Sequence, residues 1–124
     1  MSGQAIILVA LGGALGAVGR YLAGLMLKTA SGFPWATMSV NILGSFLMGL
    51  VFGWLSRQNG GSEMLRLFLA VGILGGFTTF SAFSMDLFDL LQKRDMAATT
   101  LYLGGSLFGG VAAFIIGFMA LRAG

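Results

Sequence analysis

The chain has 124 residues, of which 57% are hydrophobic and only 9% are charged, where soluble domains carry about a quarter charged residues. It contains no Cys and no His, which excludes disulfide frameworks, thiol or imidazole catalysis and the common zinc and haem ligand sets. The net charge of +3 comes from scattered basic residues, so we expect no nucleic-acid partner. The absence of Cys and His also leads us to expect no enzyme activity, and the apolar composition indicates a membrane protein in contact with a lipid bilayer.

Four apolar runs are long enough to cross a bilayer, which takes about 20 mostly apolar residues. They cover residues 4–27, 35–55, 64–91 and 97–121, and the polar connectors 28–34, 56–62 and 92–96 separate them. The first run lacks a basic leader and is longer than the apolar part of a signal peptide, so we expect a helix there. The sequence predicts an all-α membrane protein in which residues 1–124 form a single four-helix transmembrane domain.

The third run has an unusual middle. Its 28 residues would reach about 42 Å as a continuous helix, beyond the roughly 30 Å core of a bilayer. Two glycines and four hydroxyl residues interrupt it within 75–84, so we expect the third helix to be broken near its middle. Because lipid cannot satisfy freed backbone groups, this break should face protein or a cavity.

Pairs of glycines at four-residue spacing occur in every run. Such pairs let membrane helices approach closely, and ordinary helix packing is their first interpretation. The pairs are Gly12 with Gly16, Gly49 with Gly53, Gly72 with Gly76, and Gly105 with Gly109.

The basic residues are balanced between the two sides of the predicted membrane domain. One side carries Arg57, Arg66 and Arg122, and the other carries Lys28, Lys93 and Arg94. An excess of Lys and Arg normally fixes the cytoplasmic side, so this balance predicts dual topology, with one weakly fixed orientation as the alternative. Two inverted copies would pair about a two-fold axis as an antiparallel homodimer.

Few ionisable groups fall within the runs, and none is an acid at mid-depth. Arg20 lies near the end of the first run, where it could serve the function or anchor the helix at the interface. Asp86 and Asp89 lie near the end of the third run and suit a water-exposed vestibule or salt bridges with Lys93 or Arg94. Without a central carboxylate, proton-coupled or cation transport is disfavoured.

Neutral polar and aromatic groups occur at depth instead. Asn41 and the hydroxyls of the third run can donate hydrogen bonds to an anion, although a buried Asn also often joins two helices. Phe77, Phe80 and Phe83 recur every three residues, a stripe that could pack in a core or turn electropositive ring edges towards a small anion. We favour an anion pore that includes the hydroxyls of Thr79 and Ser81.

At these residues the sequence resembles the Fluc family of bacterial fluoride channels, also called CrcB proteins. The similarity covers the whole chain, and its most specific segment is GGFTTFSAFSMD at residues 75–86. The other matching segments are GGALGAVGRY at 12–21, GFPWATMSVNILGSF at 32–46 and the Gly- and Ser-rich stretch 102–110. The chain departs from the family pattern at Ala82, Asp86 and Gly110, where the family often has Thr, Glu and a hydroxyl residue.

The resemblance implies an antiparallel, dual-topology homodimer in a bacterial inner membrane, with two fluoride pores and a structural sodium ion at its centre. It implies pore roles for Phe80, Phe83 and Asn41, and a hydroxyl track at Tyr102 and Ser106. It places Arg20 and Asp86 in the vestibules and assigns the sodium ion to the main-chain carbonyls of Gly75 and Thr78. Passive fluoride efflux is the expected function. The alternatives are a small dual-topology multidrug-type exporter and a non-conducting assembly subunit.

Overall fold

The computed structural model describes residues 2–28, 32–58 and 63–122, so residues 29–31 and 59–62, parts of the predicted connectors 28–34 and 56–62, lie outside these ranges. Helices and short turns make up the described part. In chain order the elements are α1 (Gly3–Met26), α2 (Trp35–Ser56), α3 (Glu63–Arg66), the π-helix η1 (Leu67–Leu74), α4 (Gly75–Phe77), α5 (Phe80–Gln92) and α6 (Met96–Arg122).

Polar residues fix where the long helices begin. Ser2 precedes α1, and its side chain accepts a hydrogen bond from the backbone N–H of Ala5 at 3.0 Å. Before α6, a carboxylate oxygen of Asp95 accepts one from the N–H of Ala98 at 3.0 Å. Between α5 and α6, Arg94 has a positive φ of 56°, which turns the chain back within a few residues. The ends of the four helical spans agree with the predicted span boundaries to within two residues.

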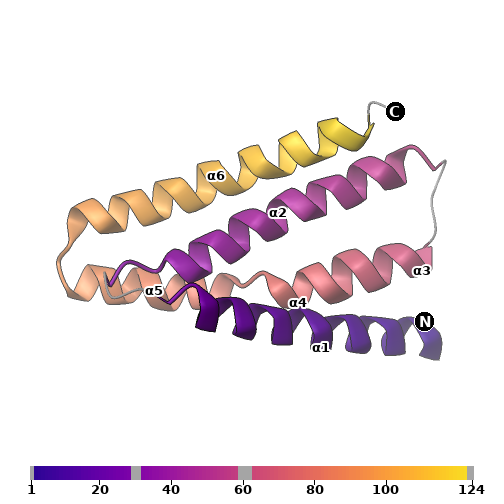
Figure 1. Cartoon of the computed structure of the whole chain (residues 1–124), viewed down its shortest axis with the longest axis horizontal. Helices are drawn as coiled ribbons and strands as arrows, with labels where there is room; N and C mark the ends of the chain where they lie inside the picture. The colour runs from indigo at the N-terminus through magenta and orange to yellow at the C-terminus, as the bar shows by residue number, and fades with distance from the viewer. Residues whose placement is uncertain (1, 29–31, 59–62, 123–124) are drawn as a thin grey trace.

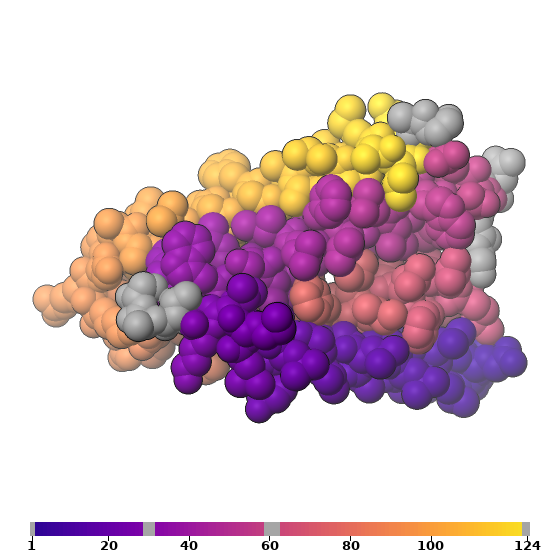
Figure 2. Space-filling view, viewed as in Figure 1, coloured from indigo at the N-terminus to yellow at the C-terminus, as the bar shows by residue number. Residues whose placement is uncertain are grey.

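The long helices pack in two pairs (Figure 1). α1 lies along η1 and α4, whereas α2 lies along α6 and runs in the same direction. The space-filling view shows the same two pairs in contact (Figure 2). Both termini lie at one end of the molecule, together with the end of α2 and the start of α3 (Figure 1).

Glycines lie where the paired helices approach most closely. A Cβ atom on Gly12 would lie 2.6 Å from the carbonyl oxygen of Phe68, and one on Gly76 would lie 2.6 Å from that of Gly13. In the other pair, a Cβ on Gly49 would collide with the backbone of Phe114. For the pairs of the first three runs, such contacts confirm the prediction that small residues permit close backbone packing. In the fourth run Gly105 and Gly109 instead face the side chains of Met38 and Ile42.

The outer surface is apolar along the length of the helices. Large side chains of this surface include Leu15, Leu25, Phe108 and Ile116, all of which are exposed. In the part of the chain that the structure describes, four helical segments, counting Glu63–Gln92 as one, are long and apolar enough to cross a membrane. An apolar surface this extensive is unfavourable in water, so the chain is a multi-pass membrane protein.

The third span is broken as predicted, but the glycines do not form the break. Gly75 and Gly76 are helical, and the chain becomes extended at Thr78 and Thr79. Gly76 instead lets α4 approach α1 at Gly13. The π-helix that precedes the break was not predicted, because its sequence, LFLAVGIL, carries no feature that separates it from an α-helix.

Candidate functional site

The centre of the candidate site is the break between α4 and α5. Thr78 has φ −85° and ψ 152°, and Thr79 has φ −149° and ψ 118°, so both residues are extended. The hydroxyl of Thr78 donates to the carbonyl of Leu74 at 2.9 Å and closes the first half of the span. The hydroxyl of Thr79 accepts from the N–H of Ala82 at 3.1 Å and starts α5. Two adjacent threonines therefore end one half-helix and begin the next.

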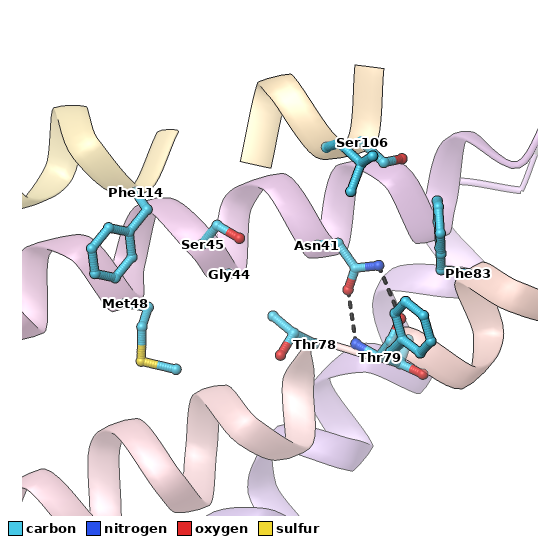
Figure 3. A pocket seen from close by; sticks show the side chains of 11 residues that line it. Asn41, Gly44, Ser45, Met48, Thr78, Thr79, Phe83, Ser106 and Phe114 are labelled. Carbon is cyan, nitrogen blue, oxygen red and sulfur yellow. Dashed lines mark hydrogen bonds between the residues drawn. The ribbon is translucent and has the colours of Figure 1, made fainter. Parts of the chain in front are cut away.

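Asn41 holds the break from α2 (Figure 3). Its amide nitrogen donates to the carbonyl of Thr79 at 3.0 Å, and its amide oxygen accepts from the N–H of Thr79 at 2.8 Å. Both backbone groups of Thr79 thus have a partner that is 38 residues away in sequence. Of the two roles that the sequence left open for Asn41, the joining of two helices is directly observed.

A cavity of about 260 Å³ lies beside this pair of hydrogen bonds. The described residues that line this cavity have no charged side chains. The lining comprises Asn41, Gly44, Ser45, Met48, Thr78, Thr79, Phe80, Phe83, Ser106, Leu107 and Phe114. We call this space the central cavity. It brings together five of the seven predicted pore residues, contributed by α2, the break, α5 and α6.

The hydroxyl of Ser106 is the unusual polar group of the central cavity. Its oxygen is buried and has no hydrogen-bond partner in the described part of the chain. A buried hydroxyl without a partner is costly, because its lost hydration is not replaced. This group is therefore available to a small polar ligand or ion that enters the cavity.

Two of the three phenyl rings that line the cavity, those of Phe80 and Phe83, differ strongly in exposure. The side chain of Phe80 is 78% exposed, whereas that of Phe83 is 7% exposed. Their ring centroids lie 5.8 Å apart with an interplanar angle of 37°. Phe83 therefore belongs to the core of the chain, and Phe80 projects from its surface.

Tyr102 and Ser81 do not line the central cavity. Tyr102 is fully buried at 0% exposure, and its hydroxyl donates to a carboxylate oxygen of Asp86 at 3.2 Å. Ser81 is exposed at the start of α5, with its hydroxyl 3.2 Å from that of Thr79. The central cavity therefore gives no support to the pore roles predicted for Tyr102 and Ser81, which stay predictions.

Arg20 lines a second cavity of about 290 Å³. Thr79 lines both cavities. The guanidinium Nε of Arg20 donates to the carbonyl of Gly76 at 3.2 Å, at the end of the first half-helix. A cation is favourable there because the carbonyl end of a helix is partly negative. Arg20 is therefore held at the break by a specific contact.

The two aspartates of α5 have different partners. Asp86 accepts the hydrogen bond from Tyr102 and lines a further cavity that also contains Lys28. Asp89 forms a salt bridge with Lys93 at 3.0 Å, as the sequence allowed. Of the two aspartates, Asp86 is therefore the one that contacts a predicted pore residue, Tyr102.

Two carbonyls at the break have lost their helical partners. The N–H of Thr79, which a continuous helix would pair with Gly75, donates to Asn41 instead. The N–H of Ala82, which would pair with Thr78, donates to the hydroxyl of Thr79. Freed carbonyl oxygens suit a hard cation such as sodium, so Gly75 and Thr78 fit the donor chemistry that the resemblance implies. No cluster of three or more His, Cys, Asp or Glu occurs among the residues that the structure describes.

Thr37 and Ser45 were missed in the sequence. Ser45 lines the central cavity, and Thr37 lines the cavity beside Arg20. With Asn41 they recur every four residues along α2, which places all three on one helical face. This polar stripe in an otherwise apolar helix was the signal that could have identified them.

Comparison with known proteins shows the family of the chain. The family model described as "CrcB-like protein, Camphor Resistance (CrcB)" matches residues 7–118. A relative from Novosphingobium aromaticivorans, named fluoride-specific ion channel FluC, is 47% identical over 118 residues, covering 92% of this chain and 93% of its own. Relatives of the same name from Hyphomonas neptunium and Thermus thermophilus are 48% and 49% identical, and each alignment covers at least 90% of both chains. The chain therefore belongs to the CrcB-like protein family.

Proposed function

We propose that this chain forms a passive, fluoride-selective channel that lets accumulated fluoride leave a bacterial cell through the inner membrane. The relatives named as fluoride-specific channels support this proposal, since they are similar over nearly the whole chain. The observation that carries it is the central cavity, in which amide, hydroxyl and phenyl groups surround the unpartnered hydroxyl of Ser106.

Neutral donors suit the passage of a small anion. Fluoride is strongly hydrated, so a path through the membrane must replace much of its water. The hydroxyls of Ser45 and Ser106 can donate hydrogen bonds, and phenyl rings can present their electropositive edges. Because none of these groups carries a full charge, the anion is not trapped, and a narrow path excludes larger chloride.

An antiparallel homodimer with two pores is part of the proposal. Phe80 lines the central cavity yet is 78% exposed, so one chain leaves the cavity open on this side. A second copy would cover Phe80 and complete the wall. The equal numbers of Lys and Arg on the two sides favour an inverted orientation for that copy.

A structural sodium ion between the two copies is also proposed. Each chain offers the freed carbonyls of Gly75 and Thr78, and Gly75 is exposed on the surface of the chain. Two chains would supply four oxygens of the kind that hard cations prefer. The ion would hold the dimer together and take no part in conduction.

Sodium removal tests this site. In sodium-free medium we expect the purified dimer to dissociate more readily and fluoride flux to stop, because the paired carbonyls would repel one another without a cation. Size-exclusion chromatography with light scattering measures the first effect, and fluoride efflux measures the second. Restoring sodium at constant ionic strength should recover both. Full flux and an unchanged dimer without sodium would contradict the sodium site.

Replacement of either phenyl ring by isoleucine tests the pore assignment. We expect Phe80→Ile and Phe83→Ile each to slow fluoride flux about tenfold, an effect of roughly 1.4 kcal/mol on the barrier, because the electropositive ring edge is lost. Phe80→Ile should leave the purified dimer as stable as the unmodified protein. Phe108→Ile, on the exposed face of α6, is the matched control. Unchanged flux in both pore variants would rule out a role for the rings.

The exporter alternative has less support. None of the four acidic residues lies in α1, α2 or α6. Glu63 begins α3, Asp86 and Asp89 lie in the last two turns of α5, and Asp95 lies in the connector before α6. Proton-coupled export requires an ionisable group that binds and releases its proton within the membrane. None of these carboxylates lines the central cavity.

Efflux from liposomes tests the proposed function. Vesicles loaded with potassium fluoride and containing the purified protein should release fluoride rapidly once valinomycin allows potassium to leave. A fluoride electrode measures the release. Release that needs a proton gradient would indicate an exporter, and release no faster than from empty vesicles would indicate a non-conducting protein. Either result would overturn the proposal.

A further inference from the structure

Five aromatic rings form a continuous row from the start of α2 to the central cavity. In order they are Trp35, Phe33, Tyr102, Phe83 and Phe80, and we call them the aromatic row. Successive ring centroids lie 4.5, 5.7, 5.1 and 5.8 Å apart. All four distances fall in the range in which aromatic rings attract one another. The row therefore joins a residue outside the spans to both predicted pore rings.

The turn before α2 places Phe33 in this row. Gly32 has a φ of +83°, a conformation that residues with a Cβ rarely adopt. The N–H of Trp35 donates to the carbonyl of Phe33 at 2.8 Å, which tightens the turn. Phe33 consequently packs against the buried cluster of Phe83, Leu90 and Tyr102.

Tyr102 links Phe33 to the pore. Its ring meets Phe33 edge-on at 89° and Phe83 at a tilt of 32°. At 0% exposure the tyrosine is completely enclosed, and its hydroxyl is fixed by Asp86. Because close-packed rings move together, loss of Phe33 would let Tyr102 shift and would change the support of Phe83.

From these contacts we infer that Phe33 is a positioning residue, which acts through Tyr102 to hold the Phe83 ring in the orientation that fluoride passage requires. The inference rests on the proposed function. Phe33 and Tyr102 lie outside the lining of the central cavity, and Phe33 lines the separate cavity beside Asp86 and Lys28 instead. Their effect on an anion in the central cavity is therefore indirect. This role gives the short turn before α2 a part in conduction.

A double-mutant experiment tests the inference. We expect Phe33→Leu to slow fluoride efflux about three- to tenfold, the effect of losing one favourable aromatic contact. Tyr102→Leu should also slow efflux, and adding Phe33→Leu to it should have little further effect, because the link is already lost. Phe33→Tyr, which keeps the ring, should restore the rate. Phe88→Leu is the matched control, because Phe88 is exposed on α5 and lies outside both the aromatic row and the lining of the central cavity.

A spectroscopic measurement reports the contact without relying on flux. The chain has two tyrosines, and labelling with 3-fluorotyrosine gives one ¹⁹F signal from exposed Tyr21 and one from buried Tyr102. Phe33→Leu should shift the Tyr102 signal and leave that of Tyr21 in place, whereas Phe88→Leu should shift neither.

The outcomes separate the inference from the proposed function. Equal slowing by Phe33→Leu in the unmodified and Tyr102→Leu backgrounds would overturn the inference, as would unchanged flux with an unshifted Tyr102 signal. An absence of fluoride flux in the unmodified protein would overturn the proposed function itself, and the ¹⁹F comparison would still report whether Phe33 contacts Tyr102.

Discussion

Replacement of Asn41 by leucine is expected to reduce fluoride flux at least tenfold, an effect of about 1.4 kcal/mol or more on the barrier. The substitution removes a hydrogen-bond donor from the central cavity and both hydrogen bonds to the backbone of Thr79. It should also lower the free energy of unfolding by about 2 kcal/mol or more, because each partly buried backbone group left without a partner costs about 1–3 kcal/mol. The break would then have no fixed geometry.

The measurements for Asn41→Leu are fluoride efflux from liposomes and thermal stability in detergent. Leu43→Ala is the matched control, because Leu43 lies two residues further along α2 and is exposed. It should change neither quantity appreciably. Normal flux in Asn41→Leu would show that the observed pair of hydrogen bonds has no part in conduction, and normal stability would show that it does not hold the break.

Replacement of Gly16 by alanine is expected to separate α1 from the first half of the third span. The new Cβ would overlap the carbonyl of Ile73 and lie 2.8 Å from the backbone nitrogen of Phe77. These are backbone atoms, which cannot give way as the end of a flexible side chain can. We expect a loss of stability of about 3 kcal/mol or more, at the upper end of the cost of overpacking.

Gly13→Ala is the matched control for this prediction. Gly13 lies on the same helix, but a Cβ there would meet nothing within 4 Å. Thermal unfolding in detergent should therefore separate the two variants clearly. Equal stability of Gly13→Ala and Gly16→Ala would contradict the close packing of α1 against η1 and α4.

The four spans could be predicted because their apolar length is set by the bilayer. The break was placed correctly within 75–84, but its physical cause could not be read from the sequence. Local composition pointed to two glycines and four hydroxyl residues together, whereas the glycines stay helical and the chain opens only at Thr78 and Thr79. What fixes the opening is the pairing of Thr79 with Asn41, a tertiary contact that no local pattern encodes.

The candidate site was predicted in part. Asn41, Thr79 and Ser106 meet at the central cavity with the predicted rings of Phe80 and Phe83, although Ser106 comes only from the less specific Gly- and Ser-rich stretch 102–110. Tyr102 is buried away from that cavity, because the direction of its ring depends on its packing against Phe33 and Phe83. Such packing cannot be inferred from the position of one tyrosine along a helix.

The central claim is that neutral groups at the break pass fluoride and exclude chloride. It is tested most directly by comparing the two anions in one preparation of liposomes loaded with equal amounts of potassium fluoride and potassium chloride. After valinomycin is added, fluoride should leave rapidly while chloride stays inside, as measured with two ion-selective electrodes. Equal loss of both anions, or retention of both, would contradict the account.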